Sequence, residues 1–163
     1  MRLFKETGWR WWWLIIGFIV LDQLTKQVVH QQMALYDSIE LLPFFNLTYV
    51  RNYGAAFSFL SDAGGWQRWF FTLIAVVISM VIAVWLSRVG RQELKLNLAL
   101  ALVLAGAIGN LIDRMVFGYV IDFFHLYYQN WHYPAFNIAD SVICIGAGLL
   151  IWDSFSSKAE DKA

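Results

Sequence analysis

Two aspartates lie beside segments that are otherwise apolar. Asp122 follows the third long apolar segment of the chain, and Asp140 opens the fourth. A carboxylate near hydrocarbon is costly, so its presence is by default a sign of function. Two carboxylates held close together cannot both ionise cheaply, and a proton shared between them can polarise a water molecule. The pair therefore predicts acid/base chemistry at one site.

Each aspartate also has to be weighed against a purely structural role. If Asn137 caps the fourth helix, Asp140 occupies the third helical position, and Asn-x-x-Asp is close to a capping box stabilised by the helix dipole. Capping therefore remains an alternative for Asp140. Asp122 has no such local role, because apolar residues flank it on both sides, and burial would raise its pKa.

Other catalytic chemistries have weaker support in the sequence. Ser141 follows Asp140 directly and points about 100° away from it on a helix. Cys144 lies on the same helical side as Asp140, but only the distant His125 and His132 could act as its base. The three histidines lack a metal-ligand spacing, and the single cysteine cannot form an intrachain disulfide. We expect no metal and no cofactor.

Further polar residues lie near the same predicted helix ends. Asp22 and Lys26 are spaced i to i+4, which predicts an ion pair on one helical face that could brace the site. Asp113 and Arg114 are adjacent at the end of the third apolar segment, shortly after Asn110. For these two neighbours, an ion pair or a helix-end anchor is the simpler interpretation.

The composition places these residues in a membrane protein. Of 163 residues, 60% are hydrophobic and only 15% are charged. The segment 69–86 has no formal charge and is long enough to cross a bilayer core of about 30 Å. The first apolar run, 11–21, resembles a secretory signal peptide, but it has no small-x-small cleavage site and continues as an amphipathic extension to His30. We predict one integral membrane domain over 1–163, with helices at about 11–30, 67–88, 94–114 and 136–156.

Charge fixes the expected orientation of these helices. Eight of the 12 Lys and Arg residues fall at one end of the predicted helices, so the positive-inside rule makes both termini cytoplasmic. The segments at about 31–66 and 115–135 then lie outside, together with Asp122 and Asp140. Polar and apolar residues alternate over 45–52, which predicts a short strand. The fold class is thus an all-α polytopic membrane protein of four transmembrane helices with a small outer sheet or loop region.

The second outer segment, about 114–134, is rich in aromatic residues. Such a composition is atypical of an aqueous loop, and it favours a lid or half-submerged segment over a site that faces lipid. The formal net charge is zero, so nothing indicates a nucleic-acid partner.

Several segments resemble one known family, the lipoprotein signal peptidases, or signal peptidase II, of bacterial inner membranes. The resemblance covers nearly the whole chain. Its motifs are Asp22–Lys26, Asn52–Ser58, Gly106–Arg114, Val120–Phe123 and Phe136–Asp140.

The resemblance implies an intramembrane aspartic endopeptidase that removes the signal peptide from prolipoproteins. It would cleave immediately before the cysteine that carries diacylglycerol, on the periplasmic side of the inner membrane. Asp122 and Asp140 would be catalytic. The implied supporting residues are Asn52, Gly54, Asn110, Arg114, Asn137, Asp22, Lys26 and Asp113. Membrane lipid and the inhibitor globomycin are implied partners, metal is not required, and we expect a monomer.

Two other classes of function were weighed. A small proton- or ion-coupled transporter component would place acidic groups along a path through the bilayer, whereas Asp22, Asp113, Asp122 and Asp140 all fall towards the outer side. A non-catalytic assembly factor would explain the small-residue spacing of Ala105 and Gly109, which predicts close helix packing, but it would leave the aspartates unexplained.

Overall fold

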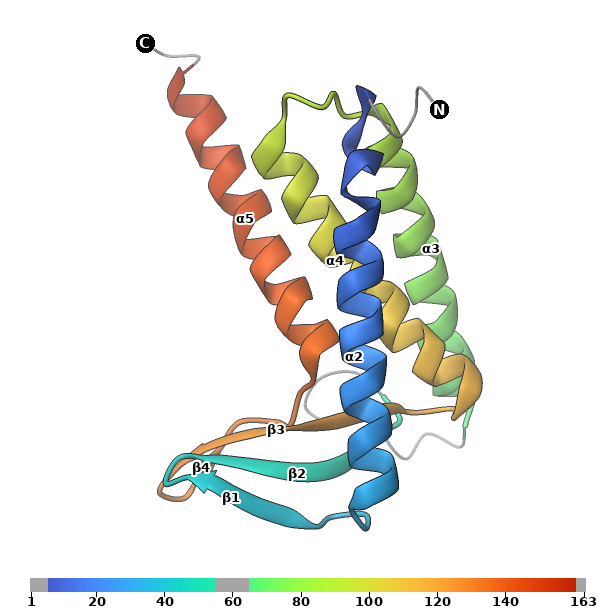
Figure 1. Cartoon of the computed structure of the whole chain (residues 1–163), viewed down its shortest axis with the longest axis vertical. Coiled ribbons are helices and arrows are strands. Elements are labelled where there is room, and N and C mark those ends of the chain that lie inside the picture. Colours follow the sequence, from blue (N-terminus) through green and yellow to red (C-terminus); the bar gives the residue numbers. More distant parts are fainter. Residues whose placement is uncertain (1–5, 55–64, 161–163) are drawn as a thin grey trace.

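Four long helices dominate the computed structural model, which describes residues 6–54 and 65–160. A short 3-10 helix, η1 (Gly8–Trp11), leads into α2 (Trp12–Gln32), and the others are α3 (Trp66–Arg88), α4 (Leu94–Val116) and α5 (Ile138–Glu160). All four are long and apolar enough to cross a membrane. In Figure 1 the helices form a bundle, with a small sheet at the end opposite to the start of α2 and the end of α5.

The inner helix of the bundle is α4, which packs against α2, α3 and α5. Small residues let the backbones approach: a Cβ on Gly106 would collide with the carbonyl oxygen of Ala139 in α5, and one on Gly109 would lie 2.6 Å from Asp22 Oδ2. The predicted close helix packing at this spacing is confirmed. In α5, Gly146 makes a similar approach to α4, whereas Gly148 faces open space and has no packing role.

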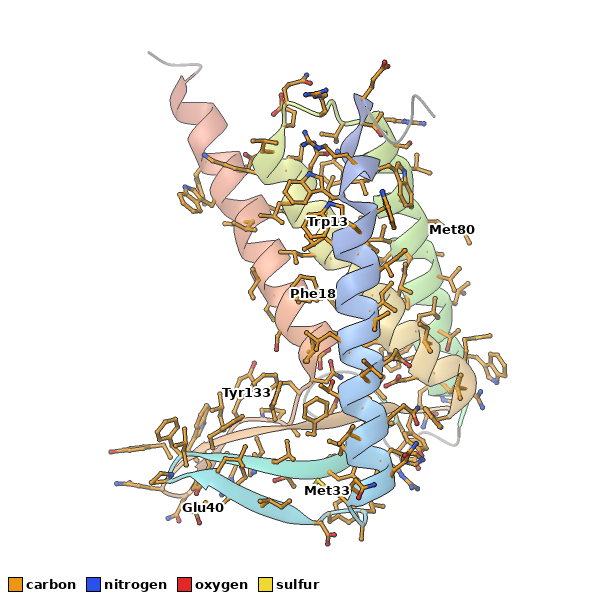
Figure 2. The ribbon with its side chains drawn as sticks, in the orientation of Figure 1. Trp13, Phe18, Met33, Glu40, Met80 and Tyr133 are labelled. Atoms are coloured by element: carbon orange, nitrogen blue, oxygen red, sulfur yellow. The ribbon has the colours of Figure 1, made fainter. Side chains whose placement is uncertain are left out.

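The other three helices expose large apolar side chains on their outer faces. Leu24 of α2 is 59% exposed, Leu73 of α3 63% and Ile151 of α5 60%. Figure 2 shows Met80 of α3 pointing away from the bundle in the same way. Such surfaces suit contact with lipid tails rather than with water.

The sheet has four antiparallel strands in the order β1-β2-β3-β4. Their bounds are β1 Ser38–Leu42, β2 Phe45–Asn52, β3 Val120–Tyr128 and β4 Trp131–His132. The strand predicted over 45–52 is confirmed by β2. It pairs with β3, which belongs to the second outer segment. The four helices and the small sheet are as expected, but the class all-α is too narrow for a fold that includes a four-stranded sheet.

The same pairing gives the structure of the aromatic segment 114–134, for which a lid or half-submerged segment stays a prediction. Most of that segment is a hairpin in the sheet, because its backbone groups need hydrogen-bond partners and β2 supplies them. A small core fixes the sheet to the end of α2, where Val29 packs with Tyr49, Ile121 and Phe123. This core holds the start of β3, and with it Asp122, against the ends of the helices.

Candidate active site

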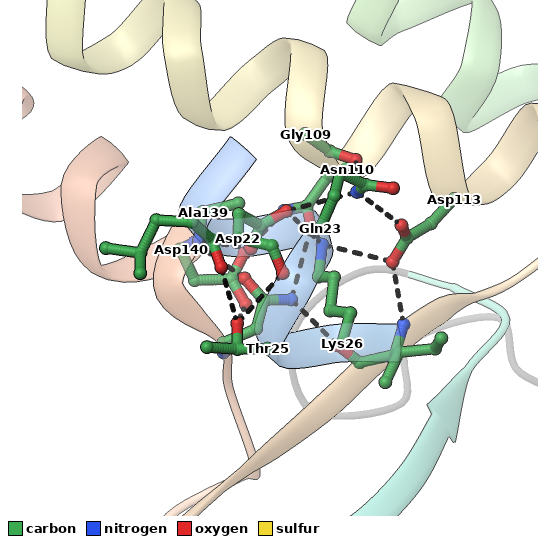
Figure 3. Close-up of polar contacts among 12 residues, drawn as sticks. Asp22, Gln23, Thr25, Lys26, Gly109, Asn110, Asp113, Ala139 and Asp140 are labelled. Atoms are coloured by element: carbon green, nitrogen blue, oxygen red, sulfur yellow. Dashed lines mark hydrogen bonds and ion pairs between the residues drawn. The ribbon is translucent and has the colours of Figure 1, made fainter. Parts of the chain in front are cut away.

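A buried charge cluster lies where α2 meets α4. Lys26 Nζ is 2.8 Å from Asp22 Oδ2 and 3.0 Å from Asp113 Oδ2. The exposed fractions of Lys26, Asp22 and Asp113 are 0%, 1% and 0%, so the three charges have little access to solvent. Figure 3 shows them between the two helices. The ion pair predicted between Asp22 and Lys26 is confirmed.

Asp113 and Arg114 do not form the ion pair that was one of the two interpretations of these neighbours, the other being a helix-end anchor. Adjacent side chains on a helix point about 100° apart, and Asp113 turns inward to Lys26, where its Oδ2 also accepts a hydrogen bond from the backbone N–H of Ile121 at 3.0 Å. Arg114 instead donates to the carbonyl oxygens of Asn110, at 3.2 Å, and Gly54, at 3.4 Å.

Asn110 connects the charge cluster to Asp140. Its Oδ1 accepts from Lys26 Nζ at 2.9 Å, and its Nδ2 donates to Asp140 Oδ1 at 2.7 Å. An ammonium group can only donate, so Lys26 fixes which end of the Asn110 amide faces it. The amide N–H groups must then point to Asp140. Lys26 thus acts on Asp140 through the orientation of one side chain.

Asn137 caps α5 and joins the two aspartates. Its Oδ1 accepts from the backbone N–H of Asp140 at 2.9 Å, and Asp140 Oδ2 accepts from the backbone N–H of Asn137 at 3.2 Å. This reciprocal pair confirms the capping box predicted from the sequence. The Asn137 Nδ2 donates to Asp122 Oδ1 at 2.7 Å and to Asn110 Oδ1 at 3.2 Å. Capping and assembly of the site are therefore done by the same residue.

Asp122 sits near the start of β3 and is 2% exposed. Its Oδ2 accepts from Asn52 Nδ2 at 3.0 Å, while its Oδ1 faces Asn137. Burial raises the pKa of Asp122 to about 7, and the negative charge of Asp140 contributes in the same direction, against the hydrogen bonds from Asn52 and Asn137. The negative charge of Asp140 is therefore close enough to influence the ionisation of Asp122.

Both carboxylates line one cavity of about 630 Å³. It is bounded by the sheet, by α4 and by the start of α5, where Ile143 and Cys144 contribute to its wall. Six of the residues predicted for the site line it: Asn52, Gly54, Asn110, Arg114, Asp122 and Asp140. The other four lie buried around the same network: Asn137, Asp22, Lys26 and Asp113.

The structure adds residues to which sequence reasoning gave no individual role. Gln23 Nε2 donates to Asp113 Oδ1 at 2.8 Å and to the Gly109 carbonyl at 3.1 Å, which ties α2 to α4. Arg51 lines the cavity, with its guanidinium carbon 4.8 Å from the ring centre of Tyr119. The alternation along β2 already placed Arg51 on the same face as Tyr49, and the Tyr49 hydroxyl accepts a hydrogen bond from Arg51 Nε at 3.0 Å. The alternation did not indicate that this face borders a cavity.

A third such residue, Arg68 of α3, holds the end of α4. Its Nε donates to the carbonyl of Arg114 at 3.1 Å and its Nη2 to that of Met115, also at 3.1 Å. Carbonyls in the last turn of a helix have no partner within the helix, so this cation both caps α4 and opposes the negative end of its dipole. No local sequence signal connects Arg68 with Arg114, which lies 46 residues further along the chain.

Comparison with known proteins identifies the family of this chain. The family described as Signal peptidase (SPase) II matches residues 14–156 of the chain. The chain belongs to the signal peptidase II family. The lipoprotein signal peptidase of Shewanella pealeana is 58% identical over 158 residues, which cover 97% of this chain and 93% of the relative. That of Shewanella woodyi is 59% identical over 150 residues, covering 92% and 85%.

Two solved structures of bacterial membrane enzymes, both determined by the in meso method, share the fold seen here. One, at 2.3 Å resolution, has a TM-score of 0.81 and 33% identity, covering 90% of this chain and 87% of the other. The second, at 1.9 Å, has a TM-score of 0.74 and 35% identity, covering 85% and 88%. Family membership makes this chain a protease with membrane-spanning helices, and it disfavours the transporter alternative.

Proposed function

We propose that this protein is an intramembrane aspartic endopeptidase that removes the signal peptide from diacylglyceryl-modified prolipoproteins. Cleavage would be immediately before the lipidated cysteine, in the bacterial inner membrane. The observation that carries the proposal is the placement of Asp122 and Asp140 on one cavity, each held by asparagine amides at the end of a bundle of membrane-length helices.

The two aspartates differ in their surroundings, and this difference supports a division of roles. Asp122 holds the proton, because burial and the neighbouring charge raise its pKa to about 7. Asp140 is the ionised base, because it lies in the first turn of α5, where the helix dipole stabilises a negative charge. Its two oxygens accept from Asn110 Nδ2 and from the backbone N–H of Asn137, and donors of this kind favour a carboxylate.

The reaction follows from this assignment. A water molecule between the carboxylates gives a proton to Asp140 while its oxygen attacks the scissile carbonyl carbon. The acidic proton of Asp122 is donated to the carbonyl oxygen, so the tetrahedral intermediate is a neutral gem-diol. The intermediate collapses as Asp140 protonates the leaving amine and a hydroxyl proton returns to Asp122. The dyad ends with one proton, as it began.

The asparagines and Arg114 would position both catalyst and substrate. Asn52 and Asn137 hold the two oxygens of Asp122 in fixed directions, which leaves the carboxyl little rotational freedom. The guanidinium of Arg114 lines the cavity close enough to Asp122 and Asp140 for electrostatic attraction. There it would also meet the carbonyl groups of a bound peptide backbone.

The membrane context accounts for the kind of substrate. A signal peptide is an apolar helix, and α5 contributes Ile143 and Cys144 to the cavity wall while exposing Ile145. A helix with an acyl-bearing end could therefore enter from the lipid beside α5. In the proposed orientation both termini are cytoplasmic and the sheet is periplasmic. We further expect that a globomycin-type cyclic peptide occupies the cavity and that the enzyme is a monomer.

The direct test is cleavage of a defined substrate by the purified protein in lipid nanodiscs. A synthetic prolipopeptide with diacylglyceryl-cysteine is expected to give a product whose new N-terminus, read by mass spectrometry, is that cysteine. The same peptide without the diacylglyceryl group is the matched control and should be cleaved much more slowly. Cleavage at another bond, or equal rates on both peptides, would contradict the proposed specificity.

A further inference from the structure

Two histidines lie side by side on the β3–β4 hairpin and take no part in the chemistry described above. Tyr127 of β3 pairs with His132 of β4, so His125 and His132 are diagonal neighbours on one face. His132 Nδ1 is 3.1 Å from His125 Nε2, and the two rings are within 16° of parallel with centres 5.1 Å apart. Figure 1 shows this hairpin at the end of the sheet away from α2.

The pair borders the same cavity as the carboxylates. Both histidines line it, and His125 follows Asp122 by three positions in β3, a separation of about 10 Å along an extended strand. His132 is exposed, so solutes that enter the cavity can reach the pair. The hairpin therefore presents two nitrogens at a place that a small ligand can reach.

The chemistry of these nitrogens suits a metal ion. Neutral imidazole is the common protein ligand for Zn²⁺, Cu²⁺ and Ni²⁺. Two nitrogens that are 3.1 Å apart can both bind one ion, each at about 2.1 Å, in neighbouring positions of its coordination sphere.

A second partner is in place to orient one of the rings. His125 Nδ1 is 3.5 Å from the hydroxyl oxygen of Thr48, and that hydroxyl is also hydrogen-bonded to Ser38 at 2.8 Å. A histidine that binds metal through one nitrogen usually donates the N–H of the other to such a group. If His125 Nδ1 carries the proton and donates to Thr48, its Nε2 keeps a lone pair, which accepts from His132 Nδ1 until an ion takes the place of that hydrogen bond.

We propose that His125 and His132 form a binding site for one divalent transition-metal ion, with Cu²⁺ or Zn²⁺ as the matching class. No third His, Cys, Asp or Glu completes such a cluster among residues 6–54 and 65–160, so water from the cavity fills the remaining positions. On binding, the hydrogen bond between the rings breaks, its proton moves to the outer nitrogen of the same ring, and the ion exchanges two waters for two imidazoles. No electron is transferred.

The site has a consequence for catalysis that rests on the proposed function. An ion here links β3 to β4 in the wall of the cavity that holds Asp122 and Asp140. It should therefore inhibit cleavage of a substrate that reaches this end of the cavity. Metal binding itself does not depend on cleavage and is measured separately, so failure of either idea can be distinguished from failure of the other.

The test is titration of the untagged full-length protein in detergent with Cu²⁺, followed by electron paramagnetic resonance. The wild type is expected to bind one ion with hyperfine structure from two imidazole nitrogens. His125→Gln and His132→Gln should each weaken binding at least about tenfold, and Thr48→Val, which removes the orienting hydroxyl, by about tenfold.

Matched variants separate this site from the other possible ligands of the cavity. Cys144→Ser and Asp122→Asn remove a thiol and a carboxylate that line the same space, and neither should change the affinity. Loss of binding in either of these variants, unchanged binding in both histidine variants, or a wild-type spectrum without nitrogen hyperfine structure would overturn the proposal. Because the spectrum of the wild type decides the ligands directly, the test holds even if a histidine variant fails to fold.

Discussion

Removal of the charge on Lys26 should destabilise the protein more than any other single lysine substitution in the described residues. Lys26→Met keeps the length of the side chain but leaves Asp22 and Asp113 buried without their cation. Breaking a buried ion pair from one side costs about 3–5 kcal/mol. Because this one ammonium serves two carboxylates and the Asn110 amide, we expect the upper part of that range.

The assay is reversible unfolding of the purified protein in mixed micelles, with the free energy of unfolding compared between variants. Lys95→Met is the matched control: Lys95 lies exposed on α4, where its ammonium is 5.4 Å from the ring centre of Trp152. Loss of an exposed cation–π contact should cost about 0.5–1 kcal/mol. The difference between the two variants isolates the effect of burial.

A triple variant tests the reason for the loss. Lys26→Met combined with Asp22→Asn and Asp113→Asn removes all three charges, and replacing a whole buried ionic group is often nearly neutral. We expect it to be more stable than Lys26→Met alone. It should still cleave poorly, since nothing then fixes the Asn110 amide towards Asp140. A Lys26→Met protein as stable as Lys95→Met, or a triple variant less stable than the single one, would refute this account of the cluster.

Four further predictions concern packing and pH. Gly106→Ala should lower the free energy of unfolding by about 1–3 kcal/mol, because the new methyl group meets the Ala139 carbonyl. Gly148→Ala, which faces open space, is the control and should not destabilise the protein. Thermal unfolding compares the two variants, and equal losses of stability would contradict the packing argument. Because the pKa of Asp122 is raised to about 7 in the folded protein, kcat/KM should fall as pH rises through about 7. For the same reason the folded state binds this proton more tightly than the unfolded chain, so the free energy of unfolding should decrease from about pH 4 to about pH 7, and Asp122→Asn should lack this slope. Asn52→Ala removes a hydrogen bond that lowers the pKa of Asp122, so it should move the alkaline limb of activity to higher pH; a shift to lower pH would contradict the assigned bond.

The sequence was sufficient where the signal is local. Long apolar runs predicted four helices because a span across hydrocarbon must satisfy its own backbone hydrogen bonds. The capping box of Asn137 and Asp140 and the ion pair of Asp22 and Lys26 were also predictable. The two partners are only three positions apart in the first case and four in the second, so each pattern is local. The alternation over 45–52 likewise identified β2.

Features that join distant segments could not be read in this way. The strand β3 is defined by its pairing with β2, and residues such as Val50 and Asp122 are partners only in the folded chain. Composition alone suggested a lid or half-submerged segment there. In the same way, nothing in the vicinity of Asp113 indicates that its partner is Lys26 rather than its neighbour Arg114.

The candidate site shows the same division. The aspartates stand out by type, because a carboxylate is rare beside hydrocarbon. Their chemical difference depends on the Asn110 amide, whose orientation is fixed by a lysine 84 positions earlier in the chain. Sequence reasoning could identify the pair but could not assign the acid and the base.

The central claim is that Asp122 and Asp140 together activate water. The most direct measurement is the single-turnover cleavage rate of diacylglyceryl prolipopeptide by Asp122→Asn and Asp140→Asn, each shown to be folded by its unfolding transition. Asp153→Asn, at a partly buried position on the same helix as Asp140, is the control and should keep the wild-type rate. The account predicts loss of cleavage by several orders of magnitude in both catalytic variants. A folded variant of either aspartate that cleaves at the wild-type rate would contradict it.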